Sequence, residues 1–207
     1  MKKIYKKIAL VNGALLLFGF IDTFYVYIAS SYFAGIVHSD NIGFFYSVVY
    51  AVTLGALFFL QPLVKRFGIA QTLLFFLAAS IFLVTLLTVL TPSIGTILIF
   101  LFFVTNALII WSLFDVLLER FSRESETGRI RGLGLTLMNL GVLLAPLAST
   151  LVLEEYSFVG VFLLTLVFYC ILFLFCLVAF RDIPKQVLPK VSLWHAVTIL
   201  RRRPALW

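Results

Sequence analysis

Asp22 is the residue of this chain whose type and surroundings point most clearly to chemistry. It lies near the middle of a long apolar stretch, residues 8–33. A carboxylate at the centre of a bilayer costs several kcal/mol unless it is paired, hydrated or protonated. If it faces a water-filled cavity, such a group can take up and release a proton, and we expect proton coupling or substrate contact here. A permanently protonated Asp22, hydrogen-bonded to Tyr25 or to a neighbouring helix, and a buried structural pair are the alternatives.

Three other side chains are candidates to line a cavity with Asp22: Tyr25, Asn106 and Trp111. Asn106 and Trp111 lie in a later apolar stretch, where an amide can form hydrogen bonds with a solute and an indole can stack on it. Polar residues in apolar helices also serve as contacts between helices. Both interpretations stay open at this stage.

Catalytic and metal chemistry have no such support. The sequence contains no Gly-Lys-[Ser/Thr] phosphate loop, no Gly-x-Ser-x-Gly elbow and no His-Glu-x-x-His helix. His38 and His195 have no metal-ligand neighbours at usable spacing, and Cys170 and Cys176 match neither a redox pair nor a zinc knuckle. We therefore expect neither an enzyme nor a bound metal or other cofactor.

The elements that must position these residues are membrane spans. The chain is 63% hydrophobic with a mean hydropathy of +1.14, well above a soluble domain, whose apolar share is about half. Six stretches have about the 20 apolar residues needed to cross a bilayer: 8–33, 43–64, 69–90, 94–118, 133–153 and 158–180. We predict an all-α, polytopic protein of the lipid bilayer, with six transmembrane helices in residues 1–180.

The cations predict the orientation of these helices. All 16 Lys and Arg precede the first span, lie between spans two and three or spans four and five, or follow span six. Positive residues stay on the cytoplasmic side, so we expect both termini in the cytoplasm and the protein in the plasma (cell inner) membrane. The net charge of +7 then reflects topology and attraction to an anionic leaflet, and not nucleic-acid binding.

Spans one to three and four to six have equal count and spacing, which predicts two inverted three-helix repeats, an arrangement found in secondary transporters. Residues 181–207 read as a cytoplasmic linker, with an amphipathic helix over 191–200; a solvated basic linker is the alternative. Residues 204–207 look like the start of a truncated seventh span. We expect the chain to be the front half of a longer protein.

A motif of small residues occupies the fifth span: Gly132, Gly141, Ala145, Pro146 and Ser149. Gly141, Ala145 and Ser149 recur every four residues and share one helix face, where small side chains allow another helix to approach closely. Pro146 removes a backbone hydrogen bond and bends the helix. We expect this face to pack against a helix from the missing C-terminal half.

The spacing of this motif resembles the fifth-helix motif of the major facilitator superfamily, Gly-x8-Gly-x3-Gly-Pro-x2-Gly-Gly, with Ala145, Ser149 and Thr150 at glycine positions. The family signature between helices two and three, Gly-x3-Asp-Arg-x-Gly-Arg-Arg, is matched at Arg66 and Gly68, and Lys65 stands at its acidic position. The residues from 119 to 132 also resemble the family's loop before helix five.

The resemblance implies the N-terminal six-helix half of a twelve-helix secondary transporter. Such a protein would move a small solute by alternating access, with a proton as the candidate coupling ion at Asp22. Its partners would be the bilayer, the solute and the C-terminal six-helix half. A self-contained six-helix membrane protein, which homo-oligomerises as a channel or as a structural or assembly partner, is the competing class.

Charged residues near the inner ends of the spans are candidates for an inside gate. Asp115 and Glu119 lie one helical turn apart and close in sequence to Arg129 and Arg131. With Arg66 and Gly68 of the signature, they could form a salt-bridge network that closes the inner side. A solvated charged face is the alternative.

Overall fold

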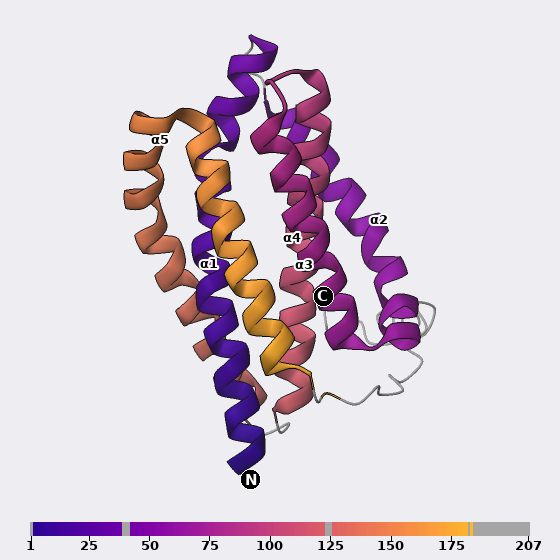
Figure 1. Cartoon of the computed structure of the whole chain (residues 1–207). Coiled ribbons are helices and arrows are strands. Elements are labelled where there is room, and N and C mark those ends of the chain that lie inside the picture. Colours follow the sequence, from indigo (N-terminus) through magenta and orange to yellow (C-terminus); the bar gives the residue numbers. More distant parts are fainter. Residues whose placement is uncertain (1, 39–41, 123–125, 182, 184–207) are drawn as a thin grey trace, which may run out of the picture.

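The computed structural model describes residues 2–38, 42–122, 126–181 and 183 of the 207-residue chain, with side chains from Tyr5 onward. All regular elements in these ranges are helices, as expected from the sequence (Figure 1). They are α1 (Lys2–Val37), α2 (Gly43–Phe67), α3 (Ile69–Val89), α4 (Ile94–Phe121) and α5 (Thr127–Ala179).

Each of the five helices is long and apolar enough to cross a membrane. The shortest, α3, has 21 residues, which extend about 30 Å at 1.5 Å per residue. A helix satisfies its own backbone hydrogen bonds, which a lipid environment requires. The chain is a multi-pass integral membrane protein.

The 53 residues of α5 contain the stretches that we predicted as two spans, 133–153 and 158–180. Ser157 leaves the helical conformation, with φ 58° and ψ −164°. Figure 1 shows the two arms of α5 lying antiparallel on either side of a reversal. The first arm is residues 127–156 and the second is residues 158–179.

The break at Ser157 lies within the predicted connection between the spans 133–153 and 158–180, although that prediction centred on Glu154, Glu155 and Tyr156. Glu154, Glu155 and Tyr156 are helical, and the break falls one residue later, at Ser157. Glutamate is a good helix former, so the acidic pair extends the first arm and does not end it. Gly160 follows closely: a Cβ there would lie 2.4 Å from Cβ of Tyr156, so the reversal is tight.

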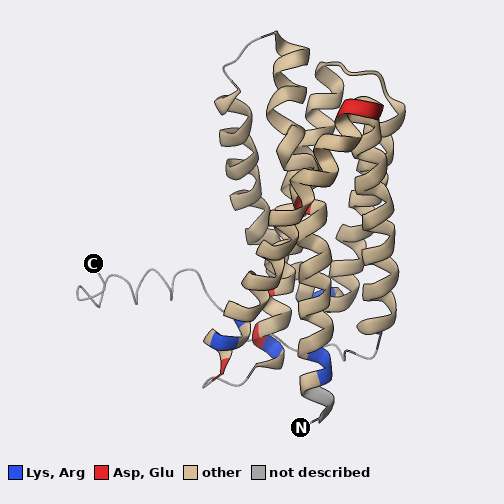
Figure 2. Ribbon diagram, turned by 90° about the vertical axis from the view of Figure 1, so that its left-hand side faces the viewer, with Lys and Arg blue, Asp and Glu red and all other residues tan. Residues whose placement is uncertain are grey.

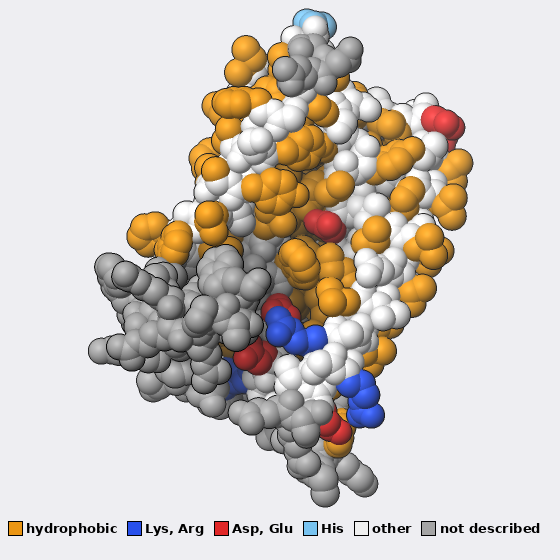
Figure 3. All heavy atoms as spheres, turned by 180° about the vertical axis from the view of Figure 1, so that it is seen from behind, with side chains coloured by type: hydrophobic (Ala, Val, Ile, Leu, Met, Phe, Trp, Pro, Cys, Tyr) orange, Lys and Arg blue, Asp and Glu red, His pale blue; other side chains and the backbone are white. Residues whose placement is uncertain are grey.

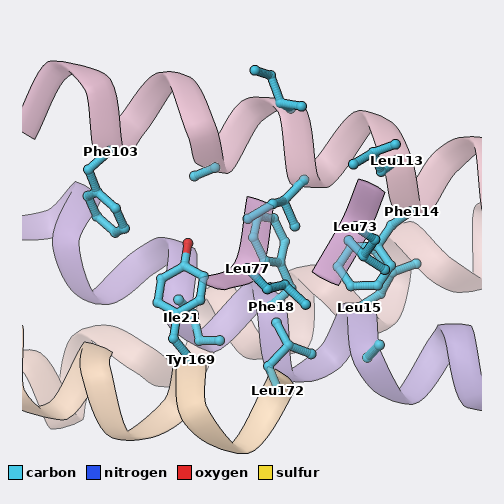
Figure 4. Close-up of a cluster of buried hydrophobic side chains, with 14 of the residues drawn as sticks. Leu15, Phe18, Ile21, Leu73, Leu77, Phe103, Leu113, Phe114, Tyr169 and Leu172 are labelled. Carbon is cyan, nitrogen blue, oxygen red and sulfur yellow. The ribbon is translucent and has the colours of Figure 1, made fainter. Parts of the chain in front are cut away.

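The core lies between α1, α3, α4 and the second arm of α5 (Figure 4). Side chains from these four helices meet there, among them Leu15, Phe18 and Ile21 of α1, Leu73 and Leu77 of α3, Phe103, Leu113 and Phe114 of α4, and Tyr169 and Leu172 of α5. The most extensive contact between elements is that of α1 with α5. α2 packs on α4 at the side of the bundle.

The charges of the described residues are segregated along the bundle. Figure 2 shows the Lys and Arg segments gathered at the end where the N-terminus lies, while the long middle of the bundle is almost free of charge. Large apolar side chains such as Phe59, Phe75 and Val178 are exposed along the bundle, as lipid contact requires. The predicted linker after residue 183, its amphipathic helix at 191–200 and the truncated span at 204–207 lie outside the described residues.

Candidate functional site

Asp22 lies on α1 in the apolar middle of the bundle and keeps partial exposure. Tyr25, one turn further along the same helix, donates a hydrogen bond from Oη to Oδ1 of Asp22 at 2.5 Å. This is the intrahelical partner that the structural interpretation of Asp22 predicted. The carboxyl is nevertheless not sealed into the core, because part of it reaches the surface of this chain.

Tyr25 itself is a core residue, with 1% of its surface exposed. Its ring packs edge-on against Phe100 and Phe103 of α4, with centroid distances of 6.1 and 4.6 Å. The structure therefore does not place the Tyr25 ring on an open wall. Only its hydroxyl reaches the site, and the rigid ring packing fixes the direction from which Asp22 receives its hydrogen bond.

Hydroxyl groups continue from Asp22 along the exposed face of α1. Ser30 Oγ lies 3.0 Å from Tyr46 Oη of α2, and Tyr27 Oη lies 3.3 Å from Thr150 Oγ1 of α5. Figure 3 shows acidic side-chain atoms in a hollow of an otherwise apolar face. These four hydroxyls were not predicted from the sequence, although their polar character within apolar stretches was a usable signal.

Asn106 is not part of this face. It is 7% exposed, and its amide Nδ2 donates to the Phe76 carbonyl oxygen at 2.7 Å and to Ser80 Oγ at 2.6 Å. Both acceptors belong to α3, so Asn106 joins α4 to α3. Of the two interpretations of this residue, the geometry favours the contact between helices.

Trp111 is 39% exposed and lines a small pocket with Asp115, Arg131 and Gly134. This pocket lies where α4 meets the beginning of α5. Trp111 is therefore associated with the charged cluster near the C-terminal end of α4.

An ion pair joins α4 to α5 at that cluster. The Arg131 Nε donates to Asp115 Oδ1 at 2.8 Å, and its Nη2 contacts Oδ2, so the pairing is bidentate. Glu119 adds to the negative field at Arg131. Both side chains of the pair are about two-fifths exposed, and such pairs contribute up to about 1 kcal/mol.

The other gate candidates are placed apart from this pair. Arg129 pairs with Glu126 within the same helix at 3.5 Å. Arg66 lies at the end of α2, with its guanidinium 5.3 Å from the centroid of the Phe67 ring. Gly68 makes the turn from α2 to α3 with φ 91°, a conformation that favours glycine.

The small-residue motif packs within this chain, and our expectation of a partner helix from the missing half is wrong for Gly141. A Cβ on Gly141 would lie 2.6 Å from the Phe20 nitrogen and 2.7 Å from the Leu16 oxygen of α1. Ala145 and Ser149 on the same face are fully buried. Gly132 is exposed with open space around it. α1 supplies the complementary small residue, Gly19, whose Cβ would meet the Met138 carbonyl at 2.1 Å.

Among the described residues, five long apolar helices, one of which carries a carboxyl in its middle, define an integral membrane protein. The sequence profile of the Major Facilitator Superfamily matches residues 11–207, and the chain belongs to this family of secondary transporters, which are not enzymes. No curated protein and no solved structure matches the chain.

Proposed function

We propose that this chain is the N-terminal half of a secondary active transporter of a small solute. Family membership supports secondary transport as the general activity. The break at Ser157 supports counting the two arms of α5 as the fifth and sixth spans, so that residues 1–180 form a six-span bundle and 181–207 the linker to a second bundle. On this proposal the two halves enclose the solute, and rocking of one against the other gives alternating access.

The orientation that we propose places both ends of the bundle and the linker in the cytoplasm of a cell whose plasma membrane holds the protein. Its support is the distribution of Lys and Arg at the end where the N-terminus lies (Figure 2), together with the positive-inside rule. With three spans in each triplet, the first triplet would begin in the cytoplasm and the second outside it, so the two triplets would be inverted repeats.

Asp22 is the residue that we propose for coupling the solute to a proton. The observation that carries this proposal is a carboxyl in the apolar middle of the bundle that is still partly exposed and is hydrogen-bonded to Tyr25. Charged, the carboxylate requires water, a cation or donors around it; protonated, it does not. A closed cavity without water therefore favours the protonated carboxyl over the carboxylate. Because protonation and closure favour each other, proton binding is coupled to the conformational change.

The wall of the cavity, on this proposal, is the face of α1 around Asp22 with the hydroxyls of Tyr46 and Thr150 at its sides. The Arg131–Asp115 pair would help to close the inner side, because it ties α4 to α5 below that face. Trp111 lines the pocket next to the pair.

The test is Asp22→Asn in the complete transporter that contains this chain, reconstituted in vesicles with an imposed pH gradient. Asparagine keeps the size and accepts the Tyr25 hydrogen bond but does not titrate, so gradient-driven solute movement should fall by at least about tenfold. Glu155→Gln, an exposed acid next to the reversal of α5 at Ser157, is the matched control and should leave transport unchanged. Transport by Asp22→Asn that follows pH as in the wild type would exclude a coupling role.

A further inference from the structure

A groove of about 650 Å³ lies at the end of the bundle where the cations gather, between the α2–α3 turn and the end of α5. It is distinct from the face around Asp22, since the two share no residue. Among the described residues its lining is mainly apolar and includes Phe67, Leu74, Leu177 and Val178, together with the polar side chains of Gln71 and Arg181. Val178 is 80% exposed, so the groove opens onto the surface that faces lipid.

Cations surround the inner end of this groove. Arg181 lines it directly. Arg66 lies over the ring of Phe67, which forms part of its wall, and Lys7 Nζ donates to the Ala179 carbonyl at 2.7 Å, next to the groove residue Phe180. Within the part of the chain that the structure describes, no acidic side chain is among the lining residues.

The first turn of α3 adds to this positive field. α3 begins at the groove, where Ala70 and Gln71 line it, and Gly68 provides no side-chain cap. The first N–H groups of a helix have no partner within the helix, and the helix dipole places partial positive charge there. An anion at this position would meet both these donors and the guanidinium of Arg181.

We propose that this groove binds an anionic phospholipid, with its phosphate between Arg181 and the first turn of α3 and an acyl chain along Leu74, Leu177 and Val178. The apolar wall favours a lipid over a soluble anion, because an isolated phosphate would leave that wall unused. The position of the groove at the cationic end of the bundle matches the interface of a leaflet rich in anionic lipid. This site is independent of the solute pathway and of the coupling role of Asp22.

The test measures lipid retention by the purified complete protein in detergent, using native mass spectrometry after addition of phosphatidylglycerol or phosphatidylcholine. The wild type should retain phosphatidylglycerol in preference to phosphatidylcholine. Arg181→Gln should reduce retained phosphatidylglycerol about fivefold, the effect of one cation near an anionic lipid surface. Ala70→Phe, which fills the groove without a change of charge, should reduce it as well.

Arg129→Gln is the matched control, because it removes one cation of α5 that is not among the groove residues, and retention should then change by less than about twofold. Unfolding temperatures in lipid-free detergent show whether each variant is folded. Equal retention by Arg181→Gln and Arg129→Gln, or equal retention of the two lipids by the wild type, would overturn the proposal. So would photo-crosslinking from position 74 to residues 184–207 in the presence of phosphatidylglycerol, which would identify the chain's own tail as the occupant.

Discussion

At the scale of single residues, the pairing of Asp22 with Tyr25 explains how a carboxyl can lie in the apolar middle of the bundle. The hydroxyl of a fully buried tyrosine donates to the carboxylate, and a hydrogen bond to a charged group is worth about 1.5–3 kcal/mol. Because Phe100 and Phe103 hold the ring, this donor is already in place before any solute arrives. One side of Asp22 is thus satisfied from within α1, and the partly exposed side is left for water, a proton or a solute.

Tyr25→Phe should separate this donor from the packing of the ring. The substitution keeps the ring between Phe100 and Phe103 and removes only the hydroxyl, so the fold should be retained. Since the lost hydrogen bond stabilised the charged carboxylate, half-maximal proton-coupled transport should move to higher pH by about one unit, the equivalent of about 1.4 kcal/mol. The measurement is the pH profile of transport in vesicles.

Tyr32→Phe is the matched control for that measurement. Tyr32 is a buried tyrosine of the same helix whose hydroxyl donates to Thr96 Oγ1 at 2.9 Å. Its removal costs a similar hydrogen bond without touching Asp22, so the pH profile should not move. A shared shift in both variants would assign the effect of Tyr25 to general destabilisation.

At the scale of elements, the crossing of α1 with the first arm of α5 depends on two glycines. Gly19 and Gly141 bring the two backbones so close that a Cβ on either would lie within 2.6 Å of a backbone atom of the other helix. Close approach of this kind is the main source of helix association where lipid removes the hydrophobic driving force. α1 carries Asp22 one turn beyond this crossing, so the contact fixes the carboxyl relative to α5.

Gly141→Ala should therefore lower stability, although alanine is the better helix former. The added methyl group must push α1 and α5 apart, and overpacking of this kind costs about 1–3 kcal/mol. Gly132→Ala, in the same helix but with open space around it, should gain up to about 1 kcal/mol from helix propensity. Unfolding temperatures of the two variants in detergent should move in opposite directions, and equal temperatures would contradict the tight crossing.

At the scale of the whole molecule, periodic apolar stretches were enough to predict where helices lie, because a helix in lipid needs only length and apolar composition. They placed the reversal in α5 between residues 153 and 158, but did not predict which residue makes it: Glu154 and Glu155 are polar, as expected of a turn, but they favour helix, and Ser157 makes the break. The sequence also did not predict which helix each helix face contacts. Gly141 indicated a close contact, but its partner, Gly19, lies 122 positions earlier in a stretch without a motif.

The same limit applies to the candidate site. Asp22 could be selected from the sequence because a carboxyl in an apolar span is costly wherever the span packs. The amide of Asn106 is also costly to bury without a hydrogen-bond partner, but it donates to Phe76 and Ser80 of α3. That pairing depends on how α3 and α4 meet. The hydroxyls of Tyr46 and Thr150 join the site only because α2 and α5 flank α1. The position of a carboxyl in the apolar middle of the bundle was thus predictable, and its surroundings were not.

The proposed orientation of the whole bundle yields a last prediction. A single cysteine at Tyr5, an exposed position at the cationic end, and one at Glu155, an exposed position next to the reversal, should lie on opposite sides of the membrane. The background protein would carry Ala in place of Cys170 and Cys176. In intact cells a membrane-impermeant thiol reagent should label Glu155→Cys and should label Tyr5→Cys only after the membrane is opened. The reverse pattern would place the cations outside, and with them the Arg131–Asp115 pair, which would then close the outer mouth of the cavity and not the inner one.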